Sequence, residues 1–562
     1  MGANLSRMAF SEKLEKFLIE ASKEDLSNVL KQIGFDKSPS QRSDFLTLIK
    51  SLAKMPVKKF EETDHMLLDD IDSLKEKIED CSFDDYYEYY DEEDELGPLK
   101  EFVKPFAKIL DRAENVFECG DMNLAANVYK KIFQLTQIEN DYGHRLELSS
   151  VSEIDEDETK ARYVRSIYCI TPASKRCQVV FALLESFVGY CQYPSIASIS
   201  EILTSAPPEW DEFLSASIDF LSQKKGNLND QWLREATLLY GGVEEIAKLA
   251  KKDGAKRPKT FVSWLDQLDV KKETDIVVKV CKLGFSTIDS RSPIRAIIAD
   301  RLEEAADVLG DKKLKKKAIW EGFLVKPELS RLIKARAIGC PMEEANRIAE
   351  DFVETEKRQS YPFDDDWDQQ VDSPESRADV ADVELIHSNI FSGNWENAFR
   401  LAKNQKDVGW SGGSSPKALF AVLSLVKQVN KSFSDLPKNL CKVWYNYGSR
   451  YYYSSNREED ILSKLQLVYE EIYTLNSSCY LNSSDVKKWV AASVEGRVKH
   501  IVSNNHRKAY DRAATIAGAY CEALEEQEGM PKAREWALKV KNWFPRHSAF
   551  QREIRSALGS YL

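Results

Sequence analysis

The sequence lacks closely spaced cysteines. A zinc ribbon or a redox-active dithiol needs two thiolates within a few residues of each other, and no C-x-C or C-x-x-C pair occurs. We expect reduced thiols that are mostly buried, because free cysteine packs as a small hydrophobic side chain. The ten cysteines are Cys81, Cys119, Cys169, Cys177, Cys191, Cys281, Cys340, Cys441, Cys479 and Cys521.

Long apolar runs are also lacking. No run approaches the roughly 20 residues that a helix needs to cross a bilayer, and no charged-then-apolar leader is visible, so we expect a cytoplasmic protein without a membrane span. The first residues, MGANLSRM, fit the pattern for myristoylation of Gly2, although Met8 is an alternative start. A single myristoyl chain would hold the protein at a membrane only marginally.

Motifs for nucleotide binding and hydrolysis are absent. The stretch GWSGGSSPK (409–417) lacks the P-loop spacing, and we interpret it as a loop that enters a helix, with Ser415 as N-cap and Pro416 at the first helical position. The nucleophile motif G-x-S-x-G does not occur either. We therefore predict no catalytic residues, no cofactor and a non-enzymatic protein. An enzyme whose site is assembled from unrelated helices remains a third hypothesis for the function.

Histidine pairs suited to a metal ion are missing from the sequence as well. None of the six histidines has a partner three or four residues away, and His500 and His506, six apart, are a poor helical pair. The acidic clusters at 153–157 and 364–368 lack the glycine and the final glutamate of an EF-hand loop. We therefore expect no bound metal.

Amphipathic helices dominate what the sequence does contain. Apolar residues recur at i, i+3, i+4 and i+7 in many segments, among them 102–117, 177–190, 295–309 and 510–526. The segment TDIVVKVCKLGF (274–285) is ambiguous between strand and helix, and we interpret it as helix. The fold class is predicted to be all-α. At 562 residues the chain is too long for one compact core, so it forms several domains or an extended array.

Four glycine-centred segments repeat one pattern. A glycine follows one amphipathic helix, and a small residue stands four or five positions later, where a second helix would cross the first closely; the glycines are Gly120, Gly310, Gly393 and Gly529. The small residues are Ala125, Ala398 and Ala533, whereas Lys315 occupies this place after Gly310. Pro327 and Pro545 end two of the units. The pattern predicts helical hairpins of about 34 residues that must stack on their neighbours, as in an α-solenoid.

These turns resemble tetratricopeptide-type repeats. A more particular resemblance, to the helical-repeat region of bacterial proteins that carry a SWIM zinc finger, lies in the order of the segments at 86–125, 139–143, 294–332, 510–526 and 541–554. The finger itself would need C-x-C followed by C-x-H, and it is missing. The resemblance therefore implies a helical scaffold and assigns no ligand residues.

Composition divides the chain into four predicted parts. The Pro-, Ser- and Asp-rich stretch 359–384 is the best candidate for a linker, because like charges and proline oppose a packed helix. We predict an N-terminal helical segment with an acidic, tyrosine-rich loop (1–98), a helical-repeat lobe (99–358), this acidic linker (359–384) and a second helical-repeat lobe (385–562).

Charge is segregated along the chain, although the net charge is −13. Lys248 to Cys340 contains 22 Lys and Arg against 13 Asp and Glu, whereas Glu79 to Glu95 contains ten acidic residues and no basic one. Neighbouring acidic and basic stretches favour a partner of complementary charge. We expect a non-enzymatic scaffold or adaptor that binds another protein or peptide on a concave surface.

A nucleic-acid partner is the alternative hypothesis. Lysines that contact phosphates and aromatic rings that stack on bases suit single strands. The opposing interpretation is a solvated helical face for the lysines and a core between helices for the aromatic residues at 443–457. The candidate surface residues for either partner are Lys312, Lys313, Lys315, Lys316, Lys317, Trp444, Arg450 and Arg457.

Overall fold

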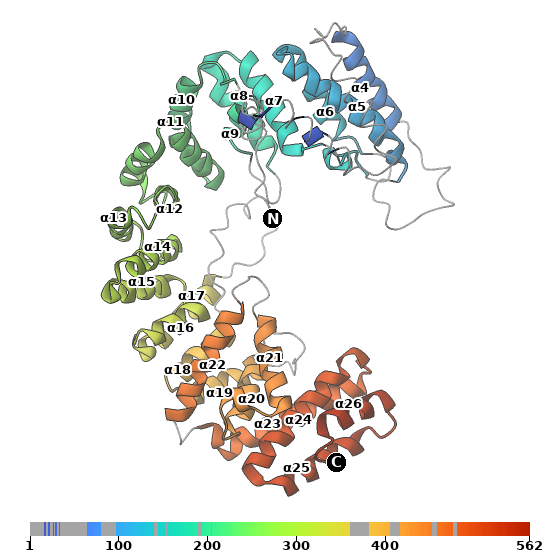
Figure 1. Ribbon diagram of the computed structural model, residues 1–562, viewed down its shortest axis with the longest axis vertical. Coiled ribbons are helices and arrows are strands. Elements are labelled where there is room, and N and C mark those ends of the chain that lie inside the picture. The colour runs from blue at the N-terminus through green and yellow to red at the C-terminus, as the bar shows by residue number, and fades with distance from the viewer. Residues whose placement is uncertain are drawn as a thin grey trace. The chain divides into compact units, whose positions relative to one another are not determined.

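The protein is helical throughout the part that its computed structural model describes (Figure 1). The described residues are 16–17, 21–22, 26, 29–30, 33, 64–79, 97–139, 144–152, 154–188, 194–203, 205–359, 382–404, 416–451, 458–475 and 480–562. Within them, the only β-type pairing is an isolated bridge between Glu139 and Arg145. The all-α fold class is therefore confirmed. The chain forms two compact units, Met1–Leu249 and Ala250–Leu562.

In unit 1 (Met1–Leu249), α4 is the first helix that the structure describes from end to end, and the unit ends within α11. Its helices are α4 (Asp64–Glu79), η1 (Gly97–Phe102), α5 (Val103–Glu118), α6 (Met122–Leu135), η2 (Leu148–Ser150), α7 (Glu156–Ile170), α8 (Ala173–Ser186), α9 (Ala197–Glu201), α10 (Trp210–Ser222) and α11 (Asn227–Asp253). The last of these is interrupted at Gly241 and Gly242, and Gly242 has φ 58° and ψ −142°, a combination that side chains disfavour. α11 is thus two helical segments joined at a glycine pair.

Unit 2 (Ala250–Leu562) contains the remaining helices of the described residues. They are α12 (Lys259–Asp266), α13 (Thr274–Thr287), α14 (Ile294–Leu309), α15 (Lys312–Val325), α16 (Leu329–Ala337), α17 (Met342–Gln359), α18 (Asp382–Phe391), α19 (Trp395–Lys403), α20 (Pro416–Lys427), η4 (Phe433–Asp435), α21 (Lys438–Tyr451), α22 (Glu458–Leu475), η5 (Tyr480–Asn482), α23 (Ser484–Ser503), η6 (Arg507–Ala509), α24 (Tyr510–Glu528), α25 (Met530–Trp543) and α26 (Ser548–Leu558). The ambiguous segment 274–285 lies in α13, so its interpretation as helix is confirmed.

The predicted glycine turns join packed helices. Gly120 has φ +86° between α5 and α6, and Gly310, Gly393 and Gly529 also have positive φ between α14 and α15, α18 and α19, and α24 and α25. Glycine adopts this conformation without the clash that a Cβ atom causes. The small residues Ala125, Ala398 and Ala533 are fully buried, as the close crossing of two helices requires. Each of the four segments is therefore a helical hairpin, as predicted.

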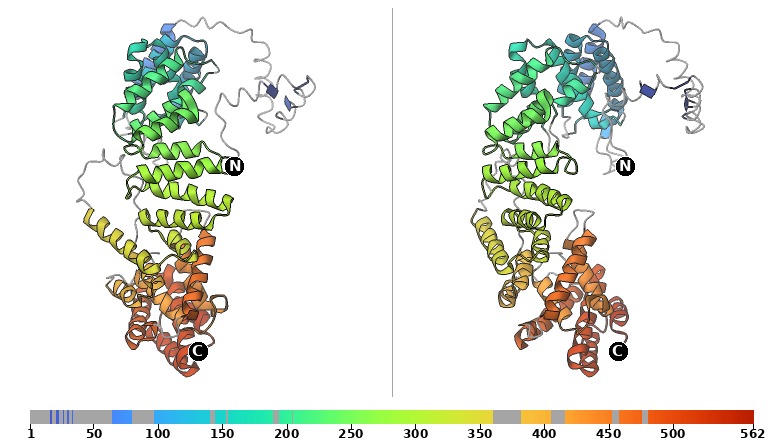
Figure 2. Two further views of the ribbon diagram at one scale, coloured as in Figure 1. Left: turned by 90° about the vertical axis from the view of Figure 1, so that its left-hand side faces the viewer. Right: turned by 60° about the vertical axis from the view of Figure 1, so that its left-hand side comes forward.

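Consecutive helices of unit 2 also pack on one another outside these hairpins. α13 packs on α14, and α15 packs on α16, so that α13 to α16 form successive layers (Figure 2). Their apolar sides meet in the interior, where Ile298, Phe323 and Leu332 are buried. The stacking follows from the amphipathic pattern, because a single hairpin cannot cover its own apolar side.

A buried carboxylate joins distant segments of unit 2. Glu522 on α24 accepts hydrogen bonds from the backbone N–H groups of Asn439 and Leu440 at the start of α21, at 3.0 and 2.8 Å, and from the side chain of Asn439 at 2.7 Å. These bonds satisfy donors that have no partner within α21. Burial raises the pKa of the Glu522 carboxyl, because the charged form loses its hydration.

The predicted domain boundaries differ from the compact units. The division lies between Leu249 and Ala250, in the last turns of α11, and helices on both sides of the predicted linker, α17 and α18, pack together within unit 2. Most of that linker, 360–381, lies outside the described residues, so its character stays a prediction. Pro416 is the first residue of α20, as predicted, and Ser415 lies outside the described residues.

Candidate interaction surface

Five of the candidate lysines lie on α15, whose ends are defined by local chemistry. Gly310 caps the preceding helix α14, and the Asp311 carboxylate accepts hydrogen bonds from the N–H groups of Lys313 and Leu314, both at 3.0 Å. An aspartate at the N-cap satisfies donors that the first turn leaves without partners. On its inner side α15 buries Ile319 and Phe323. The helix is therefore fixed along its apolar side and at its start.

The opposite side of α15 carries four exposed lysines, which we call the lysine face: Lys312, Lys313, Lys316 and Lys317. Residues four apart lie one above the other on a helix, so Lys312 stacks with Lys316 and Lys313 with Lys317. The Lys316 ammonium donates a hydrogen bond to the carbonyl oxygen of Gly339, at 2.8 Å. The structure thus brings four of the predicted residues together on one surface.

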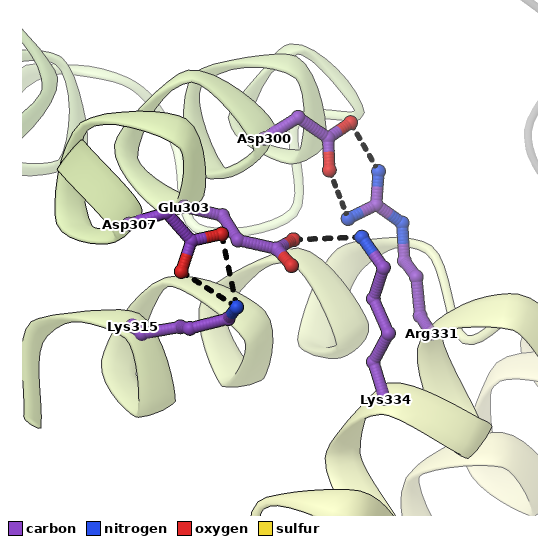
Figure 3. Close-up of polar contacts among 6 residues, drawn as sticks. All are labelled: Asp300, Glu303, Asp307, Lys315, Arg331 and Lys334. Atoms are coloured by element: carbon purple, nitrogen blue, oxygen red, sulfur yellow. Dashed lines mark hydrogen bonds and ion pairs between the residues drawn. The ribbon is translucent and has the colours of Figure 1, made fainter. Parts of the chain in front are cut away.

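Lys315, the fifth candidate lysine, points into an ion-pair cluster between helices (Figure 3). Its ammonium contacts both carboxylate oxygens of Asp307 on α14, at 2.6 and 2.9 Å. This explains how a lysine occupies the position that is alanine in the other hairpins, because its charge is neutralised on the adjacent helix. Lys315 belongs to the packing of α14 on α15 rather than to the lysine face.

Two further cations from α16 complete this cluster. Arg331 pairs with Asp300 through two parallel bonds of 2.8 and 2.7 Å, and Lys334 pairs with Glu303 at 2.8 Å (Figure 3). Arg331 passes close to Gly322, where a Cβ atom would lie only 2.3 Å from the guanidinium. The acidic side of α14 is therefore occupied by cations of its neighbouring helices.

The cations from Ile294 to Ala337 can be matched one by one with neighbouring carboxylates. Ile294 to Ala337 contains eleven Lys and Arg and seven Asp and Glu. Seven of the cations lie within 4 Å of a carboxylate; they are Arg295, Arg301, Lys315, Lys326, Arg331, Lys334 and Arg336. The four that have no carboxylate at this distance among the described residues are the members of the lysine face. The positive excess of the segment is thus concentrated on one side of α15.

Two exposed apolar residues precede the lysine face in the chain. Val308 and Leu309 form the last turn of α14 and are 49% and 48% exposed. The turn at Gly310 and Asp311 places them directly before Lys312 and Lys313 in the chain. Val308 and Leu309 are not among the candidate residues predicted from the sequence, although an apolar pair beside a lysine run is a visible signal. We call Val308 and Leu309 the apolar edge.

Trp444, a further candidate residue, does not join this surface. Trp444 is only 2% exposed and packs edge-on against Phe433 and Tyr469 in the core of unit 2, so its ring is not available for stacking on a base or a partner. Its prediction as a surface residue is therefore wrong, because the apolar side of α21 faces the core. The side chain of Arg450 and all of Arg457 lie outside the described residues.

Metal-binding clusters and membrane-spanning helices are both missing from the described part of the chain. Within the described ranges, no group of three or more His, Cys, Asp or Glu side chains is placed to hold a metal ion. His500 and His506 come within 5.9 Å between ring centroids, because the chain reverses after α23 with Asn505 at φ 56°. None of the described helices combines the length and the apolar character that crossing a bilayer requires.

Neither the family models nor the curated protein sequences give a relative from which a function could be transferred. No protein-family model matches the chain, and no curated protein sequence matches it. The resemblance to the helical-repeat region of SWIM zinc-finger proteins thus stays a prediction.

Proposed function

We propose that this protein is a non-enzymatic helical-repeat scaffold that binds another protein in the cytoplasm. The tetratricopeptide-like solenoid expected from the sequence belongs to this proposal. Its support is the series of glycine-turned hairpins, whose buried alanines and stacked layers are the building units of such arrays. Because stacked hairpins expose one side of each helix in a row, they offer a continuous surface to a partner.

The observation that carries the proposal is the unbalanced charge of the lysine face. Every other cation of the segment from Ile294 to Ala337 has a carboxylate neighbour, whereas Lys312, Lys313, Lys316 and Lys317 have none among the described residues. A surface on which four like charges are gathered favours an anionic partner.

Nucleic acid is the second candidate partner, since the same four lysines would also attract phosphates. The apolar edge argues for a protein instead, because Val308 and Leu309 can bury apolar side chains of a partner but contribute nothing to phosphate binding. In addition, Trp444, one of the aromatic residues at 443–457 that the sequence analysis considers for stacking on bases, lies in the core.

The test is to purify the tagged full-length chain at native abundance and identify what accompanies it. We expect one protein at a constant ratio to the chain, and the complex should form again from the two purified proteins. Co-purification of nucleic acid that nuclease treatment removes, with no stoichiometric protein, would contradict the proposal and favour the second candidate.

A further inference from the structure

We infer that the lysine face and the apolar edge together bind an acidic protein segment that also carries apolar side chains. This inference rests on the proposed function and names the chemistry of the partner. The surface consists of Lys312, Lys313, Lys316 and Lys317 on α15, with Val308 and Leu309 at the end of α14.

The lysines lie at the N-terminal end of α15, where positive charges are least favourable. The N-terminal end of a helix carries a partial positive charge, which disfavours cations, and like charges four residues apart repel each other. Five of the first six residues of α15 are lysines, and its first turn contains no acidic residue. Lys315 alone is neutralised by a carboxylate, that of Asp307. An arrangement that costs local stability in the free chain is relieved when carboxylates of a partner approach.

A small free anion bound at the start of α15 is not the ligand that we infer. The N–H groups of Lys313 and Leu314 are already occupied by the Asp311 carboxylate, which would repel a small anion or a phosphate. The lysine side chains, in contrast, extend from the exposed side of the helix. The partner's carboxylates therefore meet ammonium groups on the helix surface rather than backbone amides at its end.

The apolar edge restricts the partner further. Val308 and Leu309 are among the exposed large hydrophobic residues of unit 2, and they lie within five residues of Lys312 and Lys313. Burying two half-exposed aliphatic side chains requires an apolar counterpart. A segment that combines carboxylates with leucine-like side chains satisfies both parts of the surface, whereas a nucleic-acid backbone satisfies only one.

The inference is tested by fluorescence anisotropy with labelled probes and the full-length chain. The main probe is an 18-residue peptide with glutamate along one helical face and leucine along the other. The comparison probes are poly-glutamate and single-stranded poly-uridine of similar length. We expect the Glu/Leu peptide to bind at least about tenfold more tightly than either comparison probe at moderate salt, where screening weakens purely electrostatic binding.

Two variants assign the binding to the surface, and a third is the matched control. In the lysine variant, Lys312, Lys313, Lys316 and Lys317 are replaced by glutamate, and peptide binding should weaken by more than about tenfold. In the apolar-edge variant, Val308→Ser is combined with Leu309→Ser, and peptide binding should weaken by about three- to tenfold. The control replaces four exposed cations elsewhere in unit 2 by glutamate, Lys442, Lys488, Lys508 and Arg546, which have no ion pair among the described residues. It matches the change in net charge and should bind like the wild type.

Four results would overturn the inference. Equal weakening in the lysine variant and the control would show that net charge alone is measured. If poly-glutamate binds as tightly as the Glu/Leu peptide, the apolar edge does not contribute to binding. Tighter binding of poly-uridine than of the peptide would assign the surface to nucleic acid. If the protein partner from the native purification binds the lysine variant as tightly as the wild type, the inference fails while the proposed function stands.

Discussion

Arg331 and Asp300 form a two-point ion pair between α16 and α14, with Nη1–Oδ1 and Nη2–Oδ2 distances of 2.8 and 2.7 Å. Parallel bonds of this kind are the stronger class of charged contact, although Asp300 is partly exposed. Asp300→Asn should therefore lower the free energy of unfolding by about 1 kcal/mol in urea titrations. As the control, Glu304→Gln on the same helix should change it by less than about 0.5 kcal/mol, because its exposed contact to Arg301 is longer. Equal effects would show that the layers do not depend on the pairing in Figure 3.

The turns of the hairpins were predictable from sequence, and their ion pairs were not. Gly120 and Gly393 mark bends because positive φ is a local requirement that glycine meets. In contrast, the pairing of Lys315 with Asp307 depends on how two helices are rotated against each other. Trp444 was misplaced for the same reason, since an aromatic residue within a polar, tyrosine-rich stretch does not reveal which side of its helix is covered. The unpaired charge on the lysine face emerges only after all other pairs are known.

Glycine substitutions separate the role of the turns from general helix propensity. Gly310 ends α14 with φ +65°, so Gly310→Ala should lower the free energy of unfolding by about 1 kcal/mol. Gly496 lies inside α23 without positive φ, and a Cβ atom there would meet no atom within 4 Å. Gly496→Ala should therefore raise the free energy of unfolding by about 0.5–1 kcal/mol. Urea titration of both variants measures the two shifts, and shifts of the same sign would contradict the assignment of Gly310 to a hairpin bend.

His387 predicts a dependence of stability on pH. Its ring is fully buried and contacts the Tyr469 hydroxyl at 2.7 Å, and burial lowers its pKa from the ordinary 6.5 to about 3. The unfolded chain then takes up a proton first as the pH falls, so the contribution of His387 to stability is present above pH 6.5 and is lost toward pH 3. Between pH 7.5 and 5 the free energy of unfolding of the wild type should fall by about 2 kcal/mol more than that of His387→Gln, because glutamine does not titrate. Urea titrations of both proteins at each pH measure this difference. If the free energies of unfolding of the two proteins depend on pH in the same way, His387 is protonated in the folded state.

Charge reversal in the first turn of α15 should stabilise the free protein. Lys313 is in the first turn, so Lys313→Glu places a carboxylate where the helix dipole favours it and should raise the free energy of unfolding by about 0.5 kcal/mol. Lys317 lies beyond the first turn, and Lys317→Glu should leave the stability within about 0.3 kcal/mol of the wild type. Thermal unfolding, monitored by circular dichroism, measures the change in stability of both variants. A lower stability of the Lys313 variant would mean that the lysine face stabilises the free chain.

The most direct test of the central claim is hydrogen exchange of the full-length chain, alone and saturated with its purified protein partner. We predict slower amide exchange in the partner-bound chain within the segment from Val308 to Lys317, and unchanged exchange in α23, which carries none of the six residues of the surface. Unchanged exchange from Val308 to Lys317, together with protection elsewhere in the chain, would contradict the assignment of this surface to partner binding.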